Sequence, residues 1–103
     1  MNVQVTHHVD AGEQDANGMY DYFYEYDIYE FSDGRESLIA RSYTDTPLQA
    51  HFLRIANNGK GRRLCRKDLA GKLFHDAIAY LRQKGKAELY WLSNGPVTYE
   101  PIA

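Results

Sequence analysis

The chain has 103 residues, of which 44% are apolar and 25% are charged, and its formal net charge is −2. It is too short for a (β/α)₈ barrel or a doubly wound nucleotide-binding domain, has no apolar run of the roughly 18 residues that span a membrane, and lacks a signal-peptide pattern at residues 1–8. The lone cysteine, Cys65, cannot form an internal disulfide. These features predict a soluble cytoplasmic protein.

The first 18 residues are mostly polar and contain one short piece with alternating valines, Val3-Gln4-Val5. We expect a flexible tail or a weakly ordered edge strand over residues 1–18, followed by a single domain over residues 19–103. Turns are predicted at four dipeptides that tolerate positive φ. They are Asn17-Gly18, Asp33-Gly34, Asn58-Gly59 and Asn94-Gly95.

Residues 19–31 are rich in aromatic side chains and alternate in polarity, which is typical of a long β-strand. The run 36–43 follows the turn at residues 33–34 and completes a predicted hairpin. A two-residue turn would place Tyr29 opposite Leu38 and Tyr26 opposite Arg41. A longer turn would shift every one of these pairs.

Two helices are predicted next. Asp45 or Thr46 can cap a helix in which Pro47 takes the first position, and apolar residues spaced mostly three or four apart continue it to about Ala56. Residues 69–81 show one apolar stripe at helical spacing, and Gly85 ends it. Strands are expected at 86–92 and 97–102, the second at a sheet edge because it contains Pro101. The predicted fold is α+β, a small antiparallel sheet of about four strands in the order β-β-α-α-β-β with two helices packed on one face.

The two faces of the first long strand are both partly apolar. One face carries Tyr20, Tyr22, Tyr24, Tyr26 and Ile28, and the other offers Phe23, Tyr29 and Phe31, together with Leu38 and Ala40 of the next strand, as a core. Four buried tyrosine hydroxyls would each need a hydrogen-bond partner. Exposed tyrosines would suit a protein interface. The acids of the second face fit only where the strand extends beyond the helices. They are Asp21, Glu25 and Asp27.

Charge is distributed unevenly along the chain. Residues 1–36 contain nine acids and one base, and residues 54–86 contain ten bases and two acids. The two regions either face each other or bind charged partners. The most basic segment lies between the predicted helices and could hold an anion or a nucleic acid. Its bases are Lys60, Arg62, Arg63, Arg66 and Lys67.

The sequence offers little to catalysis or metal binding. His7 and His8 are adjacent, so on an extended chain they point to opposite sides and do not favour one shared ion. His51 and His75 fall on different predicted helices, and Cys65 is the only thiol. A thiol among cations can be reactive, so a small enzyme that uses Cys65 or His75 is one alternative. No catalytic residue, metal or cofactor is predicted.

We therefore expect a non-catalytic protein-binding module of regulatory, inhibitor or immunity type. Its interface would be the acidic, tyrosine-rich hairpin, and its partner would be another protein or a second copy of the chain, as in a homodimer. The predicted interface residues are Tyr20, Tyr22, Tyr24, Tyr26, Asp21, Glu25 and Asp27. Nucleic-acid binding by the basic segment 60–67 is the alternative, and no membrane partner is expected.

Overall fold

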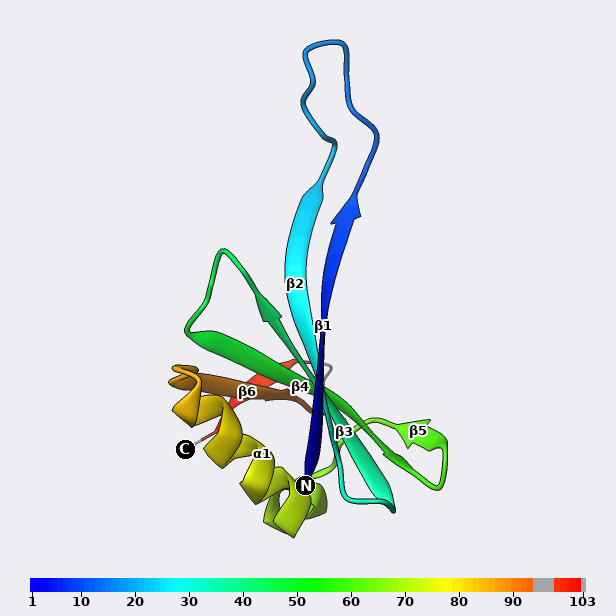
Figure 1. Ribbon diagram of the computed structural model, residues 1–103, viewed down its shortest axis with the longest axis vertical. Coiled ribbons are helices and arrows are strands. Elements are labelled where there is room, and N and C mark those ends of the chain that lie inside the picture. Colours follow the sequence, from blue (N-terminus) through cyan, green and yellow to red (C-terminus); the bar gives the residue numbers. More distant parts are fainter. Residues whose placement is uncertain (94–97, 103) are drawn as a thin grey trace.

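The computed structural model describes residues 1–93 and 98–102, and it contains one mixed β-sheet, one α-helix and one 3₁₀ helix (Figure 1). The elements are β1 (Asn2–Ala11), β2 (Phe23–Ser32), β3 (Glu36–Tyr43), β4 (Gln49–Asn57), β5 (Lys60–Arg62), the 3₁₀ helix η1 (Arg66–Ala70), α1 (Lys72–Gln83), β6 (Glu88–Leu92) and β7 (Tyr99–Pro101).

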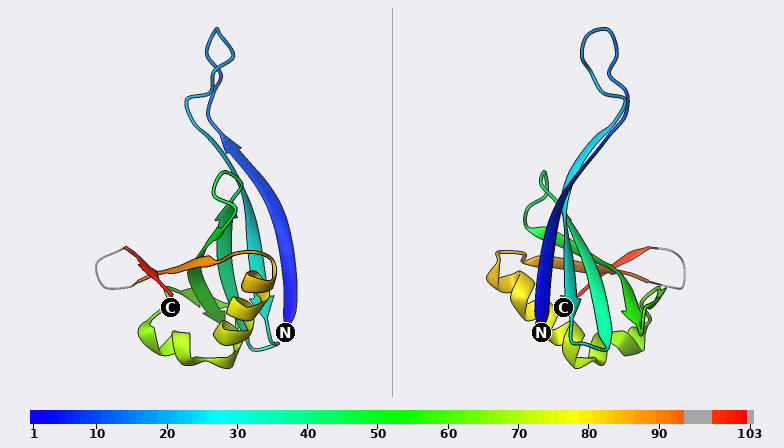
Figure 2. Two further views of the ribbon diagram at one scale, coloured as in Figure 1. Left: turned by 90° about the vertical axis from the view of Figure 1, so that its left-hand side faces the viewer. Right: turned by 45° about the vertical axis from the view of Figure 1, so that its right-hand side comes forward.

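The sheet has seven strands, six of which lie in the order β1-β2-β3-β4-β6-β7. The first four strands are antiparallel neighbours. The free side of β4 is shared: its first residues pair in parallel with β6, and its last three pair with β5. Because parallel strands need a crossover connection, η1 and α1 lie between β4 and β6 in sequence and cover one face of the sheet (Figures 1 and 2).

The core lies between α1 and the covered face of the sheet. Phe31 and Phe52 are fully buried and lie against Tyr80 and Phe74 of the helix, with ring centroids 5.6 and 4.6 Å apart. The buried apolar side chains are Tyr29, Phe31, Leu38, Ala40, Ala50, Phe52, Ile55, Leu64, Leu73, Phe74, Ala77, Leu81, Leu89 and Trp91. The opposite face of the sheet has no helix over it, and we call it the open face.

The predicted four-stranded sheet with two helices is wrong, mainly because the strand β4, residues 49–57, stands where a helix was predicted over residues 48–56. In β4, Ala50 and Phe52 point to the core at strand spacing, and Ile55 follows three residues later. The pairing with β3 shifts between Ile39 and Ala40, which leaves Leu53 as an extra residue in β4. This β-bulge changes the phase of the alternation and produces a spacing of three that imitates a helix.

The N-terminal segment forms the edge strand β1. Residues 2–11 pair with residues 23–32 of β2 without interruption. We expected either a flexible tail or an edge strand here, and the structure has an edge strand over residues 2–11. The expected boundary at residue 18 falls inside the β1–β2 connection. The alternation continues beyond Val5, because Val9 and Ala11 have the same parity, but the polar His7 interrupts the apolar face.

The turn between β2 and β3 is longer than two residues, so the register differs from that of a two-residue turn. Tyr29 pairs with Ala40 and Tyr26 with Tyr43, two residues from the pairs of the two-residue turn. A shift of two residues keeps every side chain on its original face. The predicted core side chains Tyr29, Phe31, Leu38 and Ala40 are therefore confirmed as buried, whereas Phe23 is exposed.

The elements from α1 onward lie close to their predicted positions, although β6 pairs in parallel with β4 in a sheet that was predicted to be antiparallel. Helix α1 buries Leu73, Phe74, Ala77 and Leu81, and Gly85 follows the helix with φ of 88°. Leu69 of the same predicted stripe belongs to η1 instead. The strand β7 lies at the sheet edge, as Pro101 indicated. The turn predicted at Asn94-Gly95 lies outside the described residues.

Candidate functional site

The β1–β2 hairpin extends far beyond the rest of the sheet as a two-stranded arm (Figures 1 and 2). Pairing of β2 with β3 begins only at Tyr26, so residues 9–25 lie outside the ladder with β3, and we call this segment the arm. The molecule is consequently elongated, with principal extents of 50 × 28 × 26 Å. The side chains of the arm have no helix to pack against.

Hydrogen bonds give the arm a defined shape up to its tip. The backbone N–H of Gly12 donates to Tyr22 O at 2.9 Å, and that of Asp15 donates to Met19 O at 2.7 Å. At the tip the Asp15 carboxylate accepts the N–H groups of Asn17 and Met19 at 2.8 and 2.9 Å. Gly12 lies against the ring of Tyr22, which an added Cβ would approach to 3.0 Å. Such pre-ordering lowers the entropy lost on binding.

The arm carries a concentration of exposed apolar side chains. Six of the ten large apolar residues exposed in the described part of the chain belong to it: Val9, Met19, Tyr20, Tyr22, Phe23 and Tyr24. The arm also has five acids and no lysine or arginine: Asp10, Glu13, Asp15, Asp21 and Glu25. Aromatic side chains surrounded by one sign of charge form a surface suited to a basic partner.

Five of the seven predicted interface residues lie on the arm and are exposed or half-buried, and the other two, Tyr26 and Asp27, are half-buried at its root. The rings of Tyr22 and Tyr24 lie 5.9 Å apart, and Tyr20 lies 5.4 Å from Phe23. The alternative of a core built from the tyrosine face is wrong, because Tyr20, Tyr22 and Tyr24 remain 45–51% exposed. Asp21 and Glu25 lie on the arm, before the pairing of β2 with β3 begins, whereas Asp27 lies within that pairing, opposite Ser42.

His7 lies between two acids at the root of the arm. Its Nδ1 is 2.7 Å from Asp27 Oδ1 and its Nε2 is 2.7 Å from Glu25 Oε2. His8 points to the other side and stacks on Tyr26 with ring centroids 5.4 Å apart. The two histidines therefore diverge, as the extended chain predicted. Hydrogen bonds to Asp27 and then Glu25 raise the pKa of His7 above its usual 6.5.

We expect an NMR titration of the His7 ring to give a midpoint above 6.5, and Asp27→Asn to lower that midpoint more than Glu25→Gln. The doubly hydrogen-bonded imidazolium stabilises the arm root fully below pH about 6.5, and this stabilisation is lost as the pH rises through the higher folded pKa. A short peptide containing His7 is the control and should titrate near 6.5. A midpoint in the protein at or below that of the peptide would contradict the contact.

Aromatic side chains also gather on the open face next to the arm. Arg41 of β3 lies at their centre, with its guanidinium carbon 4.8 Å from the Tyr43 ring and 5.9 Å from the Tyr26 ring. Its Nη2 donates to Tyr99 Oη at 3.2 Å. The neighbouring His51 stacks on Tyr90 with centroids 5.1 Å apart. Burial, and then the charge of Arg41, lower the pKa of His51, so its ring is neutral at pH 7.

The predicted basic segment is partly neutralised by acids of the same region. Arg62 makes a two-pronged ion pair with Asp68, with both nitrogen–oxygen distances at 2.8 Å. Arg66 lies 3.6 Å from Glu100 and 5.7 Å from the centre of the Trp91 ring. The ion pairs seen for these bases are therefore local and do not involve the acids of the arm. Lys60, Arg63 and Lys67 are exposed or half-exposed beside them.

The residues considered for catalysis or metal binding are scattered. His51 lies on a strand of the open face and His75 is exposed on α1, so the prediction of two helices carrying them is wrong. Cys65 is a half-buried free thiol at the start of η1. Among the described residues no group of three or more histidine, cysteine or acidic side chains could hold a metal ion.

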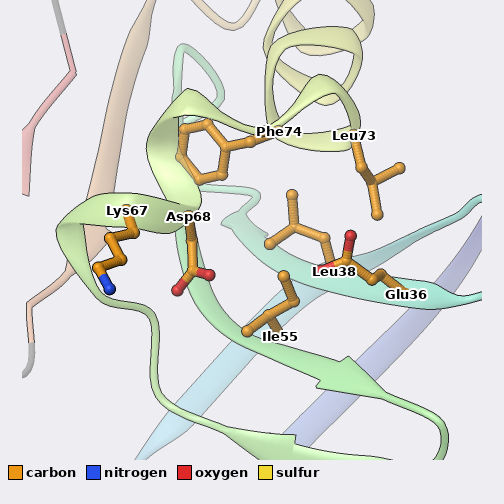
Figure 3. Close-up of a pocket in the computed structure, with 8 residues that line it drawn as sticks. Glu36, Leu38, Ile55, Lys67, Asp68, Leu73 and Phe74 are labelled. Atoms are coloured by element: carbon orange, nitrogen blue, oxygen red, sulfur yellow. The ribbon is translucent and has the colours of Figure 1, made fainter.

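One hollow of about 170 Å³ lies below the start of α1 (Figure 3). Its lining includes the core side chains Leu38, Leu73 and Phe74, which converge there, and Asp68 at its rim. The Asp68 carboxylate already accepts from Arg62 and from the Cys65 N–H. Glu36 and Lys67 also line the hollow, but its inner wall is formed by core side chains, so we treat it as a packing gap.

Sequence reasoning missed four residues beside the arm: Arg41, Tyr43, Asp45 and His51. The first two belong to the predicted hairpin, and the register decides their neighbours, because Tyr43 lies opposite Tyr26 only after the shift of two residues. Asp45 and His51 were assigned to a helix and its cap. Recognising β4 as a strand would have placed His51 on the open face opposite Arg41.

No helix in residues 1–93 and 98–102 is both long and apolar enough to cross a membrane. No protein-family model matches the chain, and no similar curated protein or solved structure was found.

Proposed function

We propose that this chain is a non-catalytic protein-binding module whose arm docks into a basic groove of another protein. The observation that carries the proposal is the projection of the arm, which presents aromatic side chains away from the domain's own core. Monomeric proteins rarely expose contiguous apolar surface of this kind without a partner. The five acids of the arm favour a partner of positive charge.

The form of the arm supports the same proposal. Its tip is closed by hydrogen bonds and its rings contact one another, so little order has to be gained on binding. Strand β1 lies at the sheet edge, and its ten residues contain one acid, no lysine or arginine and no proline. Such an edge can accept an additional strand from a partner. The single half-buried thiol suits a reducing compartment such as the cytoplasm.

The basic segment is a weaker basis for function. Two of its five bases are held by Asp68 and Glu100, which reduces the charge available to a phosphate backbone. The acidic arm also repels a nucleic acid that approaches the same molecule. For these reasons protein binding is the function that we propose.

The double variant Tyr20→Ser with Tyr22→Ser tests the arm. Both side chains are about half exposed, so the variant should keep the circular dichroism and the melting temperature of the wild type. The partner is captured from cells that express the protein, identified, purified and titrated by calorimetry. We expect the double variant to bind it at least tenfold more weakly. Val5→Ser, which replaces an equally exposed apolar side chain of β1 outside the arm, is the control.

Equal affinity of the double variant and the wild type would overturn the role of the arm. Light scattering after gel filtration separates the two kinds of partner. A wild-type dimer that the double variant converts to a monomer identifies the partner as a second copy. A monomer at both low and high salt leaves a different protein as the partner, and its affinity should then fall as salt is raised.

A further inference from the structure

The root of the arm is flanked by two hollows that share three residues. The larger hollow, of about 350 Å³, is lined by Tyr24, Tyr43, Asp45, Thr46, Gln49 and His51. The smaller, of about 190 Å³, is lined by Phe23, Tyr24, Glu25, Tyr43, Thr44 and Asp45. Tyr24, Tyr43 and Asp45 therefore form the wall between them. We call the larger hollow the notch.

The notch is held open by the backbone on both of its sides. Thr44 donates its N–H to Glu25 O at 3.0 Å, which ties the connection between β3 and β4 to the arm. The N–H of Thr46 donates to Tyr43 O at 3.2 Å and that of Gln49 to Thr46 O at 3.0 Å, so this connection folds back as a turn. A side chain entering the notch would meet walls that are already in place.

The chemistry of the walls selects for positive charge. Tyr24 and Tyr43 present two rings tilted by 52° with centroids 5.9 Å apart. The faces of aromatic rings attract cations, and Asp45 adds a carboxylate beside them. His51, the only basic side chain in the lining, has its pKa lowered by burial and so contributes no charge at pH 7.

Within the chain one of these rings, that of Tyr43, already contacts a guanidinium. Arg41 places its guanidinium 4.8 Å from the centre of Tyr43, yet Arg41 does not line the notch. The volume of the notch lies at the lower end of the range for ligand pockets, about 300–1,000 Å³, and is sufficient for one long side chain.

We propose that the notch binds one arginine or lysine side chain of the partner protein. This inference rests on the proposed function and specifies the anchor: the arm lies along the basic surface of the partner, and one of its cations enters between Tyr24, Tyr43 and Asp45. Single-stranded nucleic acid stacking on the same rings is the rival occupant. It is disfavoured by Asp45 in the notch and by Glu25 in the adjoining hollow.

The probe is the peptide acetyl-Gly-Gly-Arg-Gly-Gly-amide, titrated into ¹⁵N-labelled protein and followed by NMR. We expect millimolar binding, with the largest shifts at the amides of Tyr24, Asp45 and Thr46. The same peptide with neutral citrulline in place of arginine should bind at least fivefold more weakly, because it keeps the shape and lacks the charge. A ten-residue oligothymidylate should not displace the arginine peptide.

Four variants separate the effects of charge, ring and surface. Asp45→Asn should weaken arginine-peptide binding about tenfold, the loss of one charge-assisted contact. Tyr24→Phe should retain binding and Tyr24→Leu should lose it, because only the former keeps a ring. Glu30→Gln removes the same charge from an exposed site on β2 that does not line the notch, and it should leave the affinity unchanged.

Equal binding of the citrulline peptide, an unchanged affinity in Asp45→Asn, or competition by the oligothymidylate would each overturn the notch as a cation site. These outcomes are distinct from failure of the proposed function, which depends on Tyr20 and Tyr22 at the far end of the arm. If the double variant Tyr20→Ser with Tyr22→Ser loses the partner while Asp45→Asn keeps full affinity for it, the arm binds the partner and the notch does not hold one of its side chains.

Discussion

Phe52→Ala should lower the free energy of unfolding by about 3–5 kcal/mol, the usual cost of removing a large buried ring. Phe52 is fully buried, and its ring lies 4.6 Å from Phe74 of α1 and 6.4 Å from Phe31 of β2. It therefore joins the helix to the centre of the sheet. Domains of this size are stable by only about 5–15 kcal/mol, so the variant should lose a substantial fraction of the native stability in urea denaturation.

Leu53→Ala is the matched control for this substitution. Leu53 is the bulge residue, half-buried, and its loss should cost less than about 2 kcal/mol. In a helix over residues 48–56 both Phe52 and Leu53 would belong to the apolar stripe, and both substitutions would be severe. A similar cost for the two variants would therefore contradict the strand with its bulge.

Asp68→Asn should lower the free energy of unfolding by about 1.5–3 kcal/mol at pH 7, the range for hydrogen bonds to charged groups. The Asp68 side chain is only 9% exposed, and its carboxylate accepts two hydrogen bonds from Arg62 at 2.8 Å and one from the Cys65 N–H at 2.7 Å. An amide cannot accept all three. The variant would leave the Arg62 charge without its partner at the junction of β5 and η1.

The same contacts make this stabilisation dependent on pH. Arg62 first, and then the backbone N–H of Cys65, lower the pKa of Asp68 from 3.8 to about 2. A lowered carboxylate pKa stabilises the fold above the unfolded value, and the stabilisation is lost as the pH falls from about 4 towards 2. Urea midpoints of the wild type and Asp68→Asn should therefore differ at pH 7 and converge near pH 2.

Asp76→Asn is the control for the acid experiment. Asp76 pairs with Lys72 one turn away on α1 at 2.7 Å, but both side chains are exposed, so its loss should cost less than about 0.5 kcal/mol. If Asp68→Asn were as mild as Asp76→Asn, the ion pair at the start of η1 would not stabilise the fold.

Residues 60–68 show how much of a contact can be predicted from the local sequence. The five bases of segment 60–67 are evident from the sequence. The acid that neutralises Arg62 is Asp68, the residue that follows this segment. The spacing of three from Cys65 to Asp68 is that of a capping box, in which the acid accepts the first backbone N–H. That signal could have located the helix start and shown that one base of the segment is engaged.

The arm is the opposite case. Its residue types are evident from the sequence, but which of them are exposed depends on the fold. Alternation divided β2 into two faces correctly, but both faces are partly apolar, so neither could be assigned to the core from sequence. The length of β3 decides which residues of the hairpin can be covered. Pairing with β3 starts at Tyr26, and the residues before it lie beyond the helix and stay exposed on both faces.

By itself the sequence determined the identity of helix α1, the division of β2 and β3 into two faces, and the acidic, aromatic character of the hairpin. These are local properties, because side-chain periodicity and composition fix them within about ten residues. The strand nature of β4, the edge position of β1 and the notch beside Tyr24, Tyr43 and Asp45 were decided by the tertiary structure alone. Each depends on register between strands, and a bulge or a shift of two residues changes that register without leaving a clear local signal.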